Sequence, residues 1–189
     1  MAKATFVKCA RKDVPNSDIK KGESYYWWKF RFGGRHVSRT APRPSQLTQS
    51  EFLSTQLEIE ERINNLSCDT LEDLIAERDD LVSEIRTLGE AQQEKHDNMP
   101  EGLQDGDTGQ LLDDRASSCE EWASELEGVD IPDEDQVRAD ADHDEPVKDE
   151  SEKDKLAREE RNKEAEDSAV EEALETALND IQGCQYSGE

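Results

Sequence analysis

The residues best suited to chemistry lie in the segment 24–32, where aromatic and cationic side chains follow one another. Successive side chains of a β-strand point to opposite faces, so a strand here places Trp27, Lys29 and Arg31 on one face. Lysine and arginine neutralise phosphates, and exposed aromatic rings stack on unpaired bases. The pattern therefore predicts contact with nucleic acid through residues 24–43. The alternatives are contact with a protein, or an aromatic core whose cations are only solvated.

Gly33 and Gly34 follow this strand and predict a two-residue hairpin turn, because glycine adopts the positive φ angles that such turns require. The return strand is expected over residues 35–40, and pairing across the turn places Arg31 opposite His36. The residues predicted to contact nucleic acid are Trp27, Lys29, Arg31, Arg35, His36 and Arg39.

The opposite face of the first strand carries Tyr26 and Trp28 and is expected to be buried. A third strand is expected within residues 4–10, because a lone hairpin is only marginally stable in water. In its aromatic strand, glycine turn and basic return strand, the segment 24–44 resembles the three-stranded arm-binding modules of phage integrases, although no catalytic domain follows.

The chain also resembles small proteins encoded by tailed phages over residues 20–34, 44–53 and 98–110. This resemblance implies a phage setting and carries over no function. The sequence contains no signal peptide, no apolar run of membrane length and no lipidation signal. It therefore predicts a cytoplasmic protein without membrane contact, in the host cytoplasm if it is phage-encoded.

Charges are divided unequally along the chain. Residues 1–44 contain eleven Lys and Arg against three acids, a net charge of +8, whereas the remaining residues have a net charge of −33. Such asymmetry predicts a basic module and an acidic body that have different partners. Alternatively, the acidic residues only keep the protein in solution. Apolar residues make up 32% of the chain, so part of it is expected to lack a packed core.

Three helical patterns follow the basic module. The first begins at a capping box of Thr48 and Glu51, and the second at one of Asp69 and Glu72. The third covers residues 107–129 and carries apolar side chains at helical spacing. Short links make neighbouring helices antiparallel, which predicts a three-helix bundle or a long helical hairpin. The narrow apolar seams of two of these helices also permit a coiled-coil homodimer.

The last third of the chain is strongly acidic. Residues 131–152 are predicted to be a disordered linker, and a charged helix is expected in residues 153–189. The apolar stripe of that helix either docks on the helical body or binds a partner protein on which it folds. The residues predicted to bind a partner are Val170, Leu174, Leu178 and Ile181.

Signatures of enzymatic chemistry are missing from the sequence. It contains no phosphate-binding loop, nucleophile elbow, zinc-protease helix or dinucleotide fingerprint. The three histidines, His36, His96 and His143, lie in different segments, and the four cysteines form no paired motif. The sequence therefore predicts that the protein is not an enzyme and uses no metal or cofactor.

The predicted fold is α+β and mostly α. Its expected parts are a small β-hairpin or three-stranded module in residues 1–44, an acidic antiparallel three-helix bundle or coiled coil in 45–130, a disordered linker in 131–152 and a charged helix and tail in 153–189.

Three hypotheses for function follow. In the first, the chain is a non-enzymatic accessory protein whose basic arm contacts nucleic acid while its acidic helices bind a protein or self-associate. In the second, it is an acidic decoy that imitates DNA and occupies a host defence or DNA-handling protein. In the third, it is a scaffold for assembly.

Overall fold

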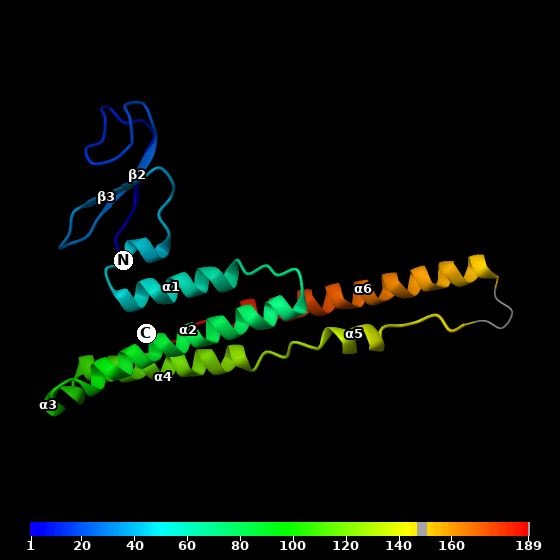
Figure 1. The fold of residues 1–189 in the computed structure, drawn as a ribbon. Coiled ribbons are helices and arrows are strands. Elements are labelled where there is room, and N and C mark those ends of the chain that lie inside the picture. Colours follow the sequence, from blue (N-terminus) through cyan, green and yellow to red (C-terminus); the bar gives the residue numbers. More distant parts are fainter. Residues whose placement is uncertain (147–150, 189) are drawn as a thin grey trace. The chain divides into compact units, whose positions relative to one another are not determined.

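The computed structural model describes residues 1–146 and 151–188, which are mostly helical with a small sheet near the N-terminus (Figure 1). They form two compact units, Met1–Glu61 and Arg62–Glu189. We call these the N-terminal unit and the helical unit. The predicted class, α+β and mostly α, is confirmed.

The N-terminal unit contains one antiparallel sheet of three strands in the order β1–β2–β3. β1 is Thr5–Val7, β2 is Tyr25–Lys29 and β3 is Arg35–Ser38. Aromatic residues favour the pleated, half-buried surface of the central strand, which pairs with a neighbour on each side. The three-stranded module predicted from the sequence is thus confirmed.

The connection between β2 and β3 differs from the predicted two-residue turn. Lys29 pairs with Arg35, so residues 30–34 form a five-residue loop. Neither Gly33 nor Gly34 has a positive φ, which the predicted turn requires. The prediction of a tight turn at the two glycines was wrong for this reason.

The longer loop exchanges the two faces of the return strand. His36 pairs with Trp28 instead of with Arg31, a displacement of three residues. An odd displacement turns each side chain of a strand to the opposite face of the sheet. Arg35 consequently lies on the same face as Trp27, and His36 lies on the other face.

The face that carries Tyr25 and Trp27 is covered by the long connection between β1 and β2. Ala10 and Ile19 from this connection are buried, and Tyr25 is only 8% exposed. The sequence predicted this face to be open and the Trp28 face to be buried. Trp28 is indeed buried, but the Tyr25 face is packed as well. The residues that pack around this small core are Val7, Val14, Trp27 and Val37.

The sheet is followed by the short 3-10 helix η1, Pro44–Leu47, and by α1, Glu51–Asn64. α1 begins two residues later than the capping box at Thr48 predicts. Ser50 takes the capping role, because its Oγ accepts a hydrogen bond of 3.4 Å from the backbone N–H of Leu53.

The helical unit is built on an antiparallel hairpin of two long helices (Figure 1). α2 covers Leu71–Asp97 and α4 covers Asp107–Glu127, with the one-turn helix α3, Glu101–Gln104, in the connection. The side chain of Thr70 caps α2 by accepting a hydrogen bond from the backbone N–H of Asp73. The predicted helical hairpin is confirmed. Its buried side chains include Leu74, Leu81, Ile85, Leu88, Cys119, Trp122 and Leu126.

Two further helices lie in the region predicted to hold a linker, a charged helix and a tail. α5 covers Glu134–Asp140, and α6 covers Glu152–Gly183. α5 packs against α6, and Arg138 forms an ion pair of 2.7 Å with Asp167. Because α5 is a helix in contact with α6, the described residues do not support the predicted disordered linker. Residues 147–150, which belong to that prediction, lie outside the described residues.

Candidate anion-binding site

The side chain of Arg35 extends along the sheet over two aromatic rings of β2. Its guanidinium carbon lies 4.8 Å from the ring centroid of Trp27 and 5.9 Å from that of Tyr25. At these distances a cation is attracted to the face of an aromatic ring. Nη2 of Arg35 also donates a hydrogen bond of 3.1 Å to the Tyr25 hydroxyl. These contacts fix the guanidinium and occupy the Trp27 ring that the sequence predicted to be available for a base.

A pocket of about 290 Å³ lies beside this guanidinium, and we call it the cationic pocket. Arg35 and Tyr25 line it from the sheet, while Arg11 and Lys12 line it from the connection after β1. It therefore combines three cations with one acid. The other lining residues are Val7, Cys9, Asp13, Val14 and Pro15.

The connection between β1 and β2 folds back on itself and so brings Arg11 and Lys12 to the sheet. The backbone N–H of Ala10 donates to the carbonyl of Glu23, and the N–H of Gly22 donates to the carbonyl of Ala10, both at 2.8 Å. Gly22 has a φ of 96°, which residues with a side chain rarely adopt. This glycine allows the connection to close and the pocket to form.

The charges of the pocket are only partly compensated. Asp13 accepts a hydrogen bond of 2.8 Å from the backbone N–H of Lys21, which holds its carboxylate on the connection. In the described part of the chain, neither Arg11 nor Lys12 forms an ion pair. An anion that enters the pocket would therefore meet cations that no carboxylate has already neutralised.

Arg39, another predicted contact residue, is committed elsewhere. Its Nη2 lies 3.2 Å from Glu23 Oε2 and donates to the carbonyl of Asp18 at 2.7 Å. The pKa of Glu23 is lowered, first because the backbone N–H of Lys20 donates to its carboxylate and further because Arg39 does. Arg39 therefore holds the connection between β1 and β2 against the sheet, and its charge is largely used within the N-terminal unit.

The structure separates the remaining predicted residues. His36 stacks on Trp28, with ring centroids 5.5 Å apart and an interplanar angle of 14°, on the face opposite Arg35. Lys29 is exposed at the end of β2, directly across from Arg35. Arg31 lies in the loop after β2, with its guanidinium 5.1 Å from the ring of Phe32. The structure thus brings Trp27, Lys29 and Arg35 together and places His36 elsewhere.

Sequence reasoning missed two cations of the pocket, Arg11 and Lys12. This basic pair directly follows the strand expected at residues 4–10. Pairing of that strand with β2 brings the pair toward the Tyr25 face, and this position was the signal that could have identified the two residues. It also missed Phe32, which is 81% exposed, and Phe6, which is 55% exposed. The alternation of side chains in the first predicted strand placed Phe32 on the face of Tyr26 and Trp28, which was expected to be buried, and Phe6 was expected only to lie in the third strand.

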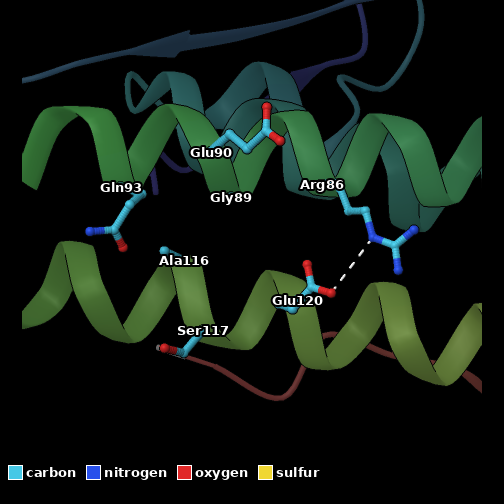
Figure 2. Close-up of a pocket in the computed structure, with 7 residues that line it drawn as sticks. All are labelled: Arg86, Gly89, Glu90, Gln93, Ala116, Ser117 and Glu120. Atoms are coloured by element: carbon cyan, nitrogen blue, oxygen red, sulfur yellow. Dashed lines mark ion pairs between the residues drawn. The ribbon is translucent and has the colours of Figure 1, made fainter.

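The helical unit has a groove between α2 and α4, which Figure 2 shows in close-up. It has a volume of about 310 Å³. Arg86 crosses it, with its Nε 3.6 Å from Glu120 and its Nη2 2.6 Å from Glu127. The cation of this groove is therefore already paired, unlike those of the cationic pocket. The other residues that line the groove are Gly89, Glu90, Gln93, Ala116 and Ser117.

The predicted partner-binding stripe lies on the C-terminal half of α6. Ile181 is fully buried within the helical unit, whereas Val170, Leu174 and Leu178 are half-buried. The residue just beyond α6, Cys184, is buried in the helical unit as well. Nε1 of Trp122 donates a hydrogen bond of 3.4 Å to the carbonyl of Cys184, just beyond α6.

Residues 1–146 and 151–188 offer neither a cluster of metal-ligating side chains nor a helix suited to crossing a membrane. These residues contain no group of three His, Cys, Asp or Glu side chains placed to hold a metal ion. None of their helices combines the length and the apolarity that crossing a membrane requires.

Comparison with family models, with curated proteins and with solved structures finds no match to this chain. The site therefore has to be interpreted from its own geometry and charge.

Proposed function

We propose that the chain is a non-enzymatic accessory protein whose N-terminal unit binds nucleic acid through its phosphates, while the acidic helical unit binds a protein or self-associates. The observation that carries the proposal is the cationic pocket. Arg11, Lys12 and Arg35 gather there without a carboxylate partner in the described residues, although the chain as a whole has a net charge of −25.

Uncompensated cations are what phosphate binding requires. Each lysine or arginine that neutralises a phosphate releases condensed counterions, and this release drives the association. Lys29 lies across the ladder from Arg35 and is exposed, so it extends the cationic surface beyond the pocket. Arg31 follows in the next loop and is exposed as well. Together these residues form a surface that can contact more than one phosphate.

We assign base stacking to Phe32 instead of to Trp27, the residue that the sequence predicted. Trp27 is occupied by the Arg35 guanidinium and packs on the small core. The Arg31 guanidinium covers one face of the Phe32 ring, 5.1 Å from its centroid, but Phe32 is 81% exposed and does not pack on the small core, so a base can stack on the other face of its ring. Stacking on an aromatic ring contributes about 1–3 kcal/mol per unpaired base. We therefore assign stacking on a single strand to Phe32.

The test is fluorescence anisotropy of labelled single- and double-stranded DNA and RNA, titrated with the full chain at several salt concentrations. We expect binding whose logarithm falls linearly with the logarithm of salt. In the variant Lys29→Ala with Arg31→Ala, the slope should flatten by about 0.7–0.9 for each lost phosphate contact. Phe32→Ala should weaken single-strand binding while leaving that slope unchanged.

The matched control is Lys153→Ala with Lys163→Ala, which removes the same charge from exposed positions of α6. It should leave the slope unchanged. A slope that changes equally in both double variants would show that net charge, and not the N-terminal surface, governs binding. No binding of any nucleic acid by the full chain at the lowest salt would overturn the proposal and favour the acidic decoy, which predicts that DNA competes for the protein partner.

A further inference from the structure

The cationic pocket has more donors than its internal contacts use. A guanidinium carries five N–H donors, and Arg35 gives one of its hydrogen bonds to Tyr25. The Tyr25 hydroxyl accepts this bond, so its own proton can be donated to a ligand. Arg11 adds a second guanidinium, a group that binds phosphate oxygens through two parallel hydrogen bonds. The pocket can therefore surround several oxygens of one anion.

The charge of the pocket suits a phosphate monoester better than a phosphodiester. A monoester carries a charge of about −1.5 to −2 at pH 7, whereas each backbone diester carries one negative charge. Arg11, Lys12 and Arg35 supply three positive charges, and Asp13, the one acid, is held by the backbone N–H of Lys21. A singly charged diester would leave most of this charge without a counterpart.

The size and shape of the cationic pocket also favour a phosphate monoester. The volume of about 290 Å³ is close to the lower end of the range for small-molecule pockets. A diester inside a strand has a nucleoside on each side, which keeps it from entering a concave site of this size. A phosphate at a strand end has a nucleoside on one side only and can enter. Val14 and Pro15 line the pocket and provide an apolar wall for that nucleoside.

We propose that the cationic pocket binds the terminal phosphate monoester of a nucleic-acid strand. This inference rests on the proposed function, because it specifies which phosphate the same surface selects. Arg11 and Arg35 hold the phosphate oxygens, Lys12 balances the charge and the Tyr25 hydroxyl donates to one oxygen. Lys29 lies outside the pocket and contacts the following backbone phosphate.

The first experiment compares one internally labelled single-stranded oligonucleotide in three forms: with a 5′-phosphate, with a 3′-phosphate and with hydroxyl groups at both ends. We expect the full chain to bind at least one phosphorylated form about tenfold more tightly than the unphosphorylated form. This is the gain that one additional charge-assisted hydrogen bond provides.

Arg11→Ala should weaken binding of the phosphorylated form more than binding of the unphosphorylated form, so that the preference between the two forms is lost. Lys20→Ala is the matched control, since it removes one positive charge from an exposed residue of the same unit that does not line the pocket. The control should retain the preference. An equal loss of preference in both variants would overturn the assignment to the pocket.

A second measurement uses the exposed thiol of Cys9, which lines the pocket. Burial raises the pKa of Cys119 and of Cys184 to about 11, so alkylating reagents react with them slowly. Burial, followed by the nearby Glu77, also raises the pKa of the Cys68 thiol. Iodoacetamide should therefore modify Cys9 first.

The 5′- or 3′-phosphorylated oligonucleotide that binds more tightly should slow alkylation of Cys9, measured by mass spectrometry. The unphosphorylated form should protect Cys9 less, and neither form should change the rate at Cys68. AMP, which carries a monoester on a single nucleoside, is the probe for a free nucleotide. Equal protection by the phosphorylated and unphosphorylated strands would overturn the inference.

The outcomes separate this inference from the proposed function. Binding of all three oligonucleotides with equal affinity overturns the terminal-phosphate inference and leaves nucleic-acid binding in place. Absence of binding to every oligonucleotide overturns both. Protection of Cys9 by AMP without any preference among the oligonucleotides also overturns the inference, because it assigns the pocket to a free nucleotide.

Discussion

Arginine side chains of the helical unit pair with carboxylates, whereas the N-terminal unit pairs Arg39 with Glu23 and leaves other cations without a carboxylate in the described residues. Arg86 on α2 contacts both Glu120 and Glu127 on α4. Among the described residues, Arg11 and Lys29 form no such pair. The two units therefore use the same residue types for different purposes.

In the acidic unit, cations join helices that would otherwise repel each other. Arg86 connects α2 with α4, and Arg138 connects α5 with α6 through Asp167. Exposed ion pairs contribute little to stability one at a time. They chiefly offset the repulsion among carboxylates, while apolar burial holds the helices together. In the N-terminal unit the uncompensated cations neutralise no carboxylate in the described residues and remain available for an anion.

The two units also differ in what they bury. Fully buried side chains of the helical unit include Trp122, Leu81 and Ile85, whereas the small core on the Tyr25 face of the sheet is formed by Ala10, Ile19 and Tyr25. Burial of apolar surface contributes about 25 cal/mol per Å². We therefore expect substitutions in the core of the helical unit to have larger effects on stability than those around the small core of the sheet.

The largest expected effect is that of Trp122→Ala. Trp122 is 2% exposed, its Nε1 donates to the carbonyl of Cys184, and its ring contacts Tyr186 edge-on at 5.8 Å. Removing it should lower the free energy of unfolding by about 3–5 kcal/mol, because it leaves a cavity between α4 and the C-terminal segment. Urea unfolding followed by far-UV circular dichroism measures the loss. Trp27→Ala, at a half-buried site of the N-terminal unit, should lower the free energy of unfolding by less. A larger loss for Trp27→Ala than for Trp122→Ala would contradict the expected difference between the two units.

A smaller loss is expected from Gly89→Ala in α2. A Cβ built at Gly89 would lie 2.9 Å from the Cβ of Cys119 on α4, so the two helices would have to move apart. Overpacking of this kind costs about 1–3 kcal/mol. Part of that cost is offset by the higher helix propensity of alanine, about 1 kcal/mol. Thermal and urea unfolding should show a net loss of stability.

The matched control for Gly89→Ala is Gly102→Ala in α3. Nothing lies within 4 Å of a Cβ built there. The control should be neutral or stabilising by about 0.4–1 kcal/mol, since alanine lowers the conformational entropy of the unfolded chain. If both substitutions stabilised the protein equally, the close approach of α2 and α4 at Gly89 would not limit packing.

The long helices could be predicted from the sequence because their signals are local. Apolar spacing and capping residues indicated α2 to within two residues of its start, and Thr70 took the capping role in place of Asp69. α5 was missed because a seven-residue helix with few apolar residues carries almost no periodic signal. It is held by long-range ion pairs such as that between Arg138 and Asp167, which no local pattern reveals.

The candidate site was predicted less well, because it depends on contacts that are distant in sequence. A pair of glycines favours a tight turn, yet a Cβ built at Gly33 would lie 3.2 Å from Gln49 Nε2, so the packing of this loop involves a residue well beyond the hairpin. The resulting register of β2 and β3 places Arg35 on the same face of the sheet as Tyr25. The cationic pocket also needs the connection that brings in Arg11, and the sequence contains no motif for that connection.

The smallest expected effect comes from removing single cations. It tests most directly whether the cations of the two units have different roles. The pKa of Glu127 lies below its ordinary value of 4.5 because the Arg86 side chain donates a hydrogen bond to it. Such a carboxylate stabilises the fold above that ordinary value, and the contribution is lost as the pH falls toward the lowered pKa of the folded state. Arg86→Gln should therefore reduce stability slightly at neutral pH, and the difference from the unmodified chain should diminish as the pH falls below the ordinary pKa of 4.5 toward the lowered pKa of Glu127.

Arg31→Gln is the matched substitution in the N-terminal unit, since it removes the same charge where no carboxylate in the described residues pairs with it. It should leave the free energy of unfolding unchanged at every pH. It should weaken nucleic-acid binding, which Arg86→Gln should leave unchanged. Urea unfolding across the pH range measures the stability of both variants, and fluorescence anisotropy at neutral pH measures their nucleic-acid binding. A pH-dependent stability loss in Arg31→Gln would mean that cations of both units serve the fold, and the division of roles between the units would then fail.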